Sequence, residues 1–206
     1  DLAALDEYTV EAGRPDCTDA EKLRIIKQYG ATRISINPQT FSDEVLRNIG
    51  RRHTAQDIID CFAAARAAGH TNINMDLIAG LPGDTVEGFT ASLRQAIALD
   101  PENITVHTLT LKRASNLVVE HRAAAYDDVS AMLESCRELA DVGYRPYYMY
   151  RQKGTLQNLE NIGWAKPGCE CLYNIYIMEE IHTILSVGAG GSTKLVIPGQ
   201  RRGKIE

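Results

Sequence analysis

Short apolar runs alternate along the chain with segments whose apolar residues recur at helical spacing. The apolar runs predict strands near residues 7–11, 33–37, 73–79, 104–109 and 147–150. The segments of helical spacing predict helices near residues 18–30, 42–49, 54–68, 85–99 and 126–142. Strands that alternate with helices in this way indicate a parallel sheet with right-handed crossovers, either as a barrel of βα units or as an open doubly wound sheet.

Capping residues mark the ends of these predicted elements. Thr18 and Glu21 have the spacing of a capping box, and Thr54 and Thr85 are suitable N-caps for the two longer helices. Pro38 is expected to close the second strand. The alternation weakens after residue 150, where residues 155–168 are expected to form a loop punctuated by glycines.

Two later segments leave alternatives open. Residues 173–185 fit a helix and a strand equally well. Residues 188–192 form a glycine-rich turn, which either joins two strands tightly or lets the main chain approach a ligand.

Composition favours a cytoplasmic globular protein with one domain, or one domain and an extension. The chain has 206 residues, of which 44% are hydrophobic and 24% charged, ordinary values for such a protein. Its net charge of −5 disfavours a nucleic-acid partner, and no apolar run approaches a membrane span, so we expect neither kind of partner. Five scattered cysteines indicate reduced thiols in a cytoplasm.

The most informative stretch covers residues 74–83, a predicted buried strand that ends abruptly in a Gly/Pro loop. Asp76 lies among the apolar residues of this strand, where an unpaired carboxylate is costly. Asp76 therefore requires a partner, which is either a neighbouring strand or loop, or a ligand.

Polar residues also end the other predicted strands. Together with Asp76 they are Glu11, Asn37, Gln39, His107, Thr108 and Thr110. Ligands collect at the carboxyl ends of parallel strands, and carboxylates and amides suit a ribose or an amino-acid ammonium group. The chain has neither Gly-x-Gly-x-x-Gly after its first strand nor a phosphate loop. Local hydrogen bonding among these side chains is the alternative.

Residues 10–16, 33–41 and 74–83 resemble successive strand motifs of radical S-adenosylmethionine enzymes. The branch they resemble is the oxygen-independent coproporphyrinogen III oxidase (dehydrogenase) family. Residues 150–168 and 173–180 resemble its HemZ-like members in particular.

The resemblance spans residues 7–196 and implies a fold of two parts. Residues 1–150 are expected to form a partial (β/α) barrel of the radical-SAM type, namely the C-terminal part of that barrel. Residues 151–206 are expected to form a mixed C-terminal extension of the coproporphyrinogen oxidase type.

The resemblance also implies a set of residues that bind S-adenosylmethionine. They are Glu11, Gln39, Arg51, Asp76, Ile78 and Thr110. Glu11 and Asp76 match carboxylates at the ribose, and Gln39 matches a glutamine on the sugar side. Ile78 and Thr110 match positions that pack around the adenine.

Arg51 matches the arginine that pairs with the methionine carboxylate, in keeping with the forked geometry of such pairs. Arg52 is the alternative for this role. A solvated cation at the end of a helix is the structural alternative for Arg51.

One feature departs from the family. Its members hold a 4Fe-4S cluster through Cys-x3-Cys-x2-Cys, and this spacing is absent among the cysteines at positions 17, 61, 136, 169 and 171. Cys169-x-Cys171 is not a substitute, so we expect no metal ligands in this chain. We therefore expect the chain to be a fragment that lacks the N-terminal cluster-binding segment, is inactive alone and has an unpaired sheet edge.

The implied function of the parent is that of a radical-SAM oxidoreductase of haem biosynthesis. A 5′-deoxyadenosyl radical would start the oxidative decarboxylation of coproporphyrinogen III propionates to vinyl groups. The partner is then a small-molecule porphyrinogen, with an electron donor and acceptor that the sequence does not identify. The alternatives are a haem-binding chaperone of the same family and, more distantly, a βα enzyme that needs no cluster.

Two groups of residues are candidates for contact with a tetrapyrrole. The first is a set of tyrosines that suit a flat macrocycle, although core packing explains them equally well: Tyr147, Tyr148, Tyr150, Tyr173 and Tyr176. The second is a set of basic residues, most of which we expect to be surface charges: Arg14, Arg113, Arg145, Arg151, Lys153 and Lys166. His107 is the histidine nearest the predicted site, and a structural role is favoured for it.

Overall fold

The computed structural model describes residues 4–110, 127–151, 154–197 and 204–205. The chain divides into two compact units, Asp1–Glu170 and Cys171–Glu206, which are described separately. The sequence-based boundary at residue 150 stays a prediction. No helix in the described ranges is long and apolar enough to cross a membrane.

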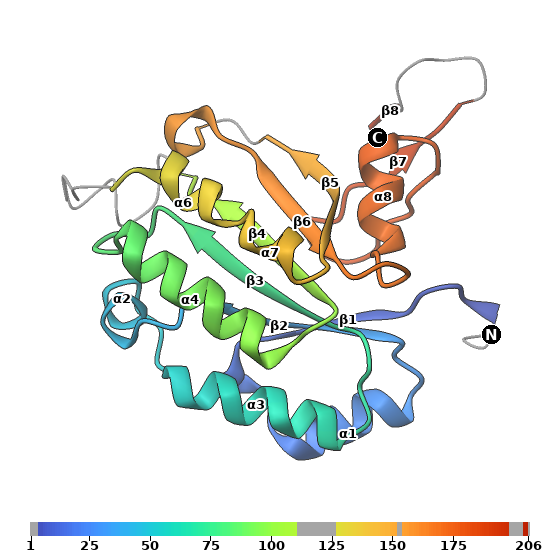
Figure 1. The fold of residues 1–206 in the computed structure, drawn as a ribbon. Helices are drawn as coiled ribbons and strands as arrows, with labels where there is room; N and C mark the ends of the chain where they lie inside the picture. Colours follow the sequence, from blue (N-terminus) through green and yellow to red (C-terminus); the bar gives the residue numbers. More distant parts are fainter. Residues whose placement is uncertain (1–3, 111–126, 152–153, 198–203, 206) are drawn as a thin grey trace. The chain divides into compact units, whose positions relative to one another are not determined.

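A six-stranded sheet of the order β1-β2-β3-β4-β6-β5 forms the first unit. Its strands are β1 (Thr9–Gly13), β2 (Arg33–Gln39), β3 (Ile73–Ala79), β4 (Asn103–Thr108), β5 (Arg145–Tyr150) and β6 (Asn161–Ala165). Strands β1 to β4 pair in parallel, whereas β6 is antiparallel to both of its neighbours (Figure 1). The expected α/β class and parallel-dominated sheet are confirmed, and the sheet stays open within the described residues.

The α-helices of this unit pack on one face of the sheet (Figure 1). They are α1 (Ala20–Gln28), α2 (Asp43–Asn48), α3 (Ala55–Ala67), α4 (Val86–Leu99), α6 (Val129–Ser135) and α7 (Glu138–Asp141). Two short 3-10 helices, η2 (Pro15–Cys17) and η3 (Leu156–Asn158), follow β1 and precede β6. Every second residue of β3, from Ile73 to Ala79, joins helix residues such as Phe62 and Leu93 in the core.

Two of the predicted caps are confirmed and one is wrong. Thr54 forms a capping box with Asp57 at the start of α3, and Thr85 caps α4. At α1 the cap is Asp19, whose carboxylate accepts a hydrogen bond from the Lys22 N–H at 2.8 Å. The Thr18 hydroxyl instead donates to the Ala12 carbonyl at 2.7 Å, because it closes the turn after β1.

The sequence prediction also misses two features near β5. The predicted helix over residues 126–142 divides into α6 and α7, because the main chain tightens into i→i−3 hydrogen bonds from Cys136 to Ala140; residue 126 lies outside the described residues. Residues 155–168, expected to form a loop, contain strand β6. Gly163 in this strand gives room for the Tyr148 ring of β5, so a residue typical of loops serves close packing here.

The described residues of the second unit form one helix and one small antiparallel pair of strands. Helix α8 (Leu172–Glu179) resolves the ambiguous segment at 173–185 in favour of a helix over its first part. Strands β7 (Lys194–Leu195) and β8 (Lys204–Ile205) pair antiparallel. The Lys194 ammonium lies 2.7 Å from a carboxylate oxygen of Glu180 and ties β7 to the end of α8.

We expect Gly163→Ala to lower the free energy of unfolding by about 1–3 kcal/mol, the usual cost of overpacking. The added methyl group would lie 1.8 Å from Cε1 of Tyr148, so the ring has to move. Chemical denaturation of the purified protein measures the loss. In a Tyr148→Ala background the same substitution should cost much less, and an equal cost in both backgrounds would show that the ring is not the cause.

Candidate functional site

The sheet has a polar face opposite its helices. Side chains alternate between the two faces of a strand, and the parallel register sets equivalent residues of neighbouring strands side by side. The residues of this face on the first four strands are Glu11, Ser35, Asn37, Asn74, Asp76, Ile78, Asn103, Thr105 and His107. We call them the polar face.

Asn74 links three strands of the polar face. Its amide nitrogen donates to the Ser35 hydroxyl at 2.9 Å and to Oδ1 of Asp76 at 2.7 Å. Its amide oxygen accepts from the Thr105 hydroxyl at 2.9 Å. Ser35 in turn donates to Oδ1 of Asn37 at 2.6 Å. Asn74 is 4% exposed, and its side-chain amide therefore has partners for both its nitrogen and its oxygen.

Asp76 is held from two sides and remains partly open. Its Oδ1 accepts from Asn74, and its Oδ2 lies 3.7 Å from Nε2 of His107. The Asp76 side chain is 18% exposed and that of His107 is 30% exposed. On the other side of the imidazole, Nδ1 lies 3.5 Å from the Tyr150 hydroxyl. The expected partner of Asp76 thus exists within the protein, and the carboxylate still reaches solvent.

Tyr148 and Tyr150 extend the polar face onto β5. Their rings stack with centroids 6.2 Å apart and planes at 8°. Burial raises the pKa of both phenols, and the negative charge of Asp76 adds to the shift. Both side chains are therefore neutral near pH 7 and present a flat surface beside the carboxylate.

The other predicted cofactor residues lie around this face. Glu11 is exposed on β1, and Ile78 is half-buried beside His107 in the register of β3 and β4. Gln39 ends β2 with a φ of 73°, and its amide donates to the Asn37 carbonyl at 3.3 Å. Thr110 follows β4 and forms an isolated bridge with Thr155.

Arg51 comes from the loop between α2 and α3 rather than from a strand. Its N–H donates to the Leu46 carbonyl at 2.8 Å, so its position is fixed by the end of α2. Arg51 is half-buried, whereas Arg52 is exposed. The structure thus gathers Glu11, Asp76 and Ile78 on one face, and the binding roles of all six residues stay predictions.

The side chains of this region have the chemistry that S-adenosylmethionine requires. Two carboxylates that reach solvent, Glu11 and Asp76, can accept from hydroxyls or an ammonium group, and the half-buried Ile78 gives an apolar wall. An iron–sulfur cluster does not fit the residues present. In the described ranges no three His, Cys, Asp or Glu side chains are grouped to hold a metal. Burial raises the pKa of the Cys61 and Cys136 thiols to about 11 and about 12, which opposes thiolate ligation.

The candidate contacts with a tetrapyrrole are dispersed. Arg151 pairs with Glu160, and the Lys166 ammonium lies 2.7 Å from the Asp100 carboxylate. Arg14 lies 3.6 Å from Asp16. The remaining candidates are Arg145, which is exposed; Tyr173 and Tyr176, which belong to α8; and Arg113 and Lys153, which lie outside the described residues.

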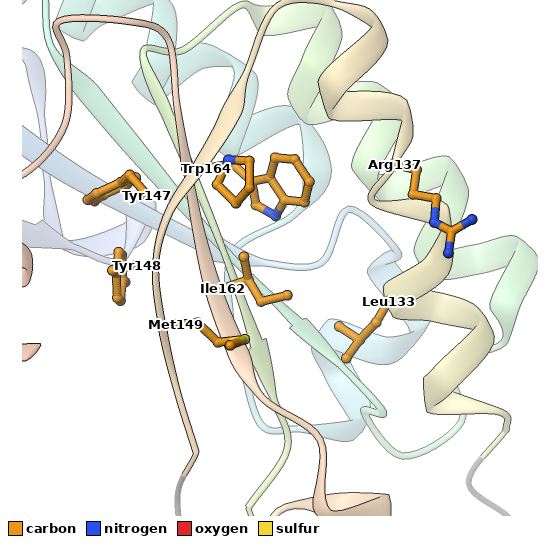
Figure 2. A pocket seen from close by; sticks show the side chains of 8 residues that line it. Leu133, Arg137, Tyr147, Tyr148, Met149, Ile162 and Trp164 are labelled. Atoms are coloured by element: carbon orange, nitrogen blue, oxygen red, sulfur yellow. The ribbon is translucent and has the colours of Figure 1, made fainter.

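A separate apolar pocket of about 590 Å³ lies between α6 and strands β5 and β6 (Figure 2). Its lining residues are Leu133, Arg137, Pro146, Tyr147, Tyr148, Met149, Ile162 and Trp164. Figure 2 shows Leu133 on the helix side of the pocket and Ile162 and Trp164 on its strand side. Two of the predicted tetrapyrrole contacts, Tyr147 and Tyr148, line this pocket.

Sequence reasoning missed several residues of the polar face. Ser35, Asn74 and Thr105 each lie two residues before a predicted site residue, so the two-residue alternation of polar side chains was the signal that identifies them. Tyr148 and Tyr150 were named as candidate contacts with a macrocycle, but their place beside Asp76 was not predicted, because it depends on the pairing of β5 with β6.

Comparisons with known proteins identify relatives of this chain. The profile of the Radical SAM superfamily matches residues 4–96. The oxygen-independent coproporphyrinogen-III oxidase-like protein HemZ of Bacillus subtilis (strain 168) is 46% identical over 200 residues, which cover 95% of this chain and 40% of that protein. The haem chaperone HemW of Escherichia coli (strain K12) is 30% identical over 204 residues, which cover 97% of this chain and 50% of HemW. The chain thus spans half or less of the length of these relatives.

Among solved structures, coproporphyrinogen III oxidase (HemN) from Escherichia coli, described as a radical SAM enzyme, matches with a TM-score of 0.70. The match has 21% sequence identity and covers 91% of this chain and 44% of HemN. At this identity the likeness shows the fold alone: the open sheet of this chain matches part of a radical-SAM (β/α) barrel.

We expect Asp76→Asn to lower the pKa of the Tyr150 phenol. A nearby negative charge disfavours the phenolate, so its removal favours ionisation, while burial keeps the pKa above its ordinary value. NMR titration of protein with ¹³C-labelled tyrosine rings measures the change. Tyr144 is the control, since its raised pKa comes from burial and from Asp100 and Glu102 instead. An unchanged Tyr150 pKa would contradict the electrostatic link.

Proposed function

The chain belongs to the radical S-adenosylmethionine superfamily, and from this premise we propose that its polar face binds S-adenosylmethionine in an oxygen-independent coproporphyrinogen III dehydrogenase. The observation that carries the proposal is the placement of Asp76. The Asp76 carboxylate, fixed by Asn74 yet partly open, lies midway along β3 and contacts His107 near the carboxyl end of β4, on the face opposite the helices of the first unit. Ligands collect at such ends in βα folds.

Each of the six residues takes the role that the family resemblance implies. Glu11 and Asp76 accept hydrogen bonds from the ribose hydroxyls, and Gln39 contacts the sugar side. Arg51 pairs with the methionine carboxylate through two parallel N–H bonds. Ile78 and Thr110 pack around the adenine.

Membership in the superfamily implies S-adenosylmethionine and a 4Fe-4S cluster as cofactors. S-adenosylmethionine supplies the species that abstracts a hydrogen atom. No step is assigned to the cluster, because the residues of this chain do not fit one. The part played by the chain is to bind the nucleoside, orient it and keep water from the reacting carbon.

The substrate step converts a propionate side chain to a vinyl group. A propionate side chain would give up one hydrogen atom to the species that S-adenosylmethionine supplies, and would then lose carbon dioxide and one electron, so that a carbon–carbon double bond forms. The electron passes to an external acceptor. Tyr148 and Tyr150 suit a place beside this reaction because their raised pKa values keep them neutral, and their stacked rings offer a flat contact for a macrocycle.

A haem chaperone is the second candidate function. It is favoured by the similarity to HemW, which extends over almost the whole chain. The higher identity to HemZ favours the dehydrogenase. We also propose a cytoplasmic location, on the strength of the composition and the cysteine usage.

We expect the complete gene product that contains these residues, reconstituted without oxygen, to convert coproporphyrinogen III to protoporphyrinogen IX. One 5′-deoxyadenosine should form for each vinyl group, as measured by chromatography of both products. Asp76→Ala should abolish both products together, because it removes a carboxylate from the ribose. Tight haem binding by the wild-type protein without any porphyrinogen product would favour the chaperone and contradict the dehydrogenase.

A further inference from the structure

His53 is a buried histidine in the loop between α2 and α3. Its side chain is 0% exposed, although it follows two arginines in the sequence. The next residue, Thr54, forms the capping box of α3, and the Ala55 N–H donates to the Asp43 carboxylate at 2.7 Å. The first turns of α2 and α3 therefore both hold the main chain that carries the imidazole.

The first contact of His53 is with the end of β2. Its Nε2 lies 3.3 Å from the Pro38 carbonyl oxygen, and since a carbonyl only accepts, Nε2 is the donor. Pro38 precedes Gln39, whose φ of 73° lies in the left-handed region that non-glycine residues rarely adopt. The pairing of β2 with β3 also shifts register between Ile36 and Gln39. His53 thus supports β2 where its regular pairing is interrupted.

The second contact is with the segment after β1. Nδ1 of His53 lies 3.6 Å from Oδ1 of Asp16, a residue of η2. The same carboxylate oxygen lies 3.6 Å from Nε of Arg14, so Asp16 is shared between the imidazole and a residue just after β1. Nδ1 is buried and has no hydrogen-bond partner among the described residues. The imidazole therefore donates to the Pro38 carbonyl and lies beside the Asp16 carboxylate without a hydrogen bond to it.

These contacts join three segments that carry proposed cofactor residues. Glu11 precedes the η2 segment, Gln39 follows Pro38, and Arg51 shares the loop of His53. We propose that His53 is a positioning residue that holds these three segments in the arrangement that binds S-adenosylmethionine. This inference rests on the proposed function, because it concerns the same ligand. His53 acts through its neighbours and does not itself touch the cofactor.

The chain offers a matched control in His70. As whole residues, His70 and His53 are both 2% exposed. Nε2 of His70 lies 2.9 Å from the main-chain carbonyl oxygen of Leu23. It lies between α3 and the start of β3, at the amino end of the sheet. Replacing His70 therefore removes a comparable buried hydrogen bond at the end of the strands away from the site.

The test compares equilibrium binding of S-adenosylmethionine, measured by calorimetry on the reconstituted complete gene product, with the thermal unfolding midpoint. We expect His53→Asn to weaken binding by about tenfold, the effect of losing roughly one hydrogen bond that orders the binding loops. His53→Gln should stay within about threefold of wild type, because its longer amide can still donate to Pro38. His70→Asn should lower the unfolding midpoint and leave the affinity unchanged.

Two further variants separate the possible failures. Arg51→Gln should weaken binding by about tenfold or more, since it removes a direct ion pair. If it does so while His53→Asn binds like wild type, the positioning role is wrong and the proposed site stands. If His53→Asn does not fold, Asp16→Ala in the partly exposed η2 segment decides, with about threefold weaker binding expected and unchanged binding contradicting the role. A wild-type protein that does not bind S-adenosylmethionine overturns the proposed function and this inference together.

Discussion

The buried amide of Asn74 is the interaction on which the polar face depends. It joins Ser35 of β2, Asp76 of β3 and Thr105 of β4 through bonds of 2.7–2.9 Å. A buried polar group left without a partner costs about 1–3 kcal/mol. The loss of any one of these bonds would therefore leave an N–H or the oxygen of the Asn74 amide unpaired. Because Asn74 occupies Oδ1 of Asp76, the second carboxylate oxygen is turned toward His107 and solvent. The position of the proposed ribose contact is thus set by a neighbour that is itself only 4% exposed.

The two faces of the sheet perform separate tasks. One face buries the apolar residues of β2, β3 and β4 against the helices and supplies the stability. The other face carries the polar network and the neutral tyrosines of β5, and it is the face opposite the helices of the first unit (Figure 1). The loops at the carboxyl ends are held by a few specific contacts, such as the hydrogen bond from Nε2 of His53 to the Pro38 carbonyl. Strands and individually anchored loops together place groups from distant parts of the sequence around the proposed S-adenosylmethionine site.

Local signals predicted the parallel part of the fold well. The caps Thr54 and Thr85 and the apolar run of β3 act within a few residues, so the sequence alone identifies them. At α1, two adjacent residues are both good caps, and the turn after β1 decides between them by taking the Thr18 hydroxyl. Strand β6 was missed because its pairing with β4 and β5 is long-range, and because Gly163 has the local character of a loop.

The same distinction holds for the candidate site. Asp76 was found because it is a carboxylate within an apolar strand, and His107 because it lies near the end of a strand, and both are properties of the sequence. Their mutual contact, the bridging role of Asn74 and the inward position of Tyr150 depend on strand register. His53 gave no signal at all, since its contacts join residues 15 and 37 positions away in the chain.

Hydrogen exchange of the complete gene product with and without S-adenosylmethionine tests the central claim most directly. If the cofactor binds at the carboxyl ends of β1 to β3, its addition slows exchange in the segments that follow these strands, near residues 11–16, 37–42 and 76–83, and in the loop at 49–54. The segments at the amino ends, near residues 29–32 and 69–72, keep their rates. Protection confined to the amino ends, or absent from all four carboxyl-end segments under saturating cofactor, would contradict the account.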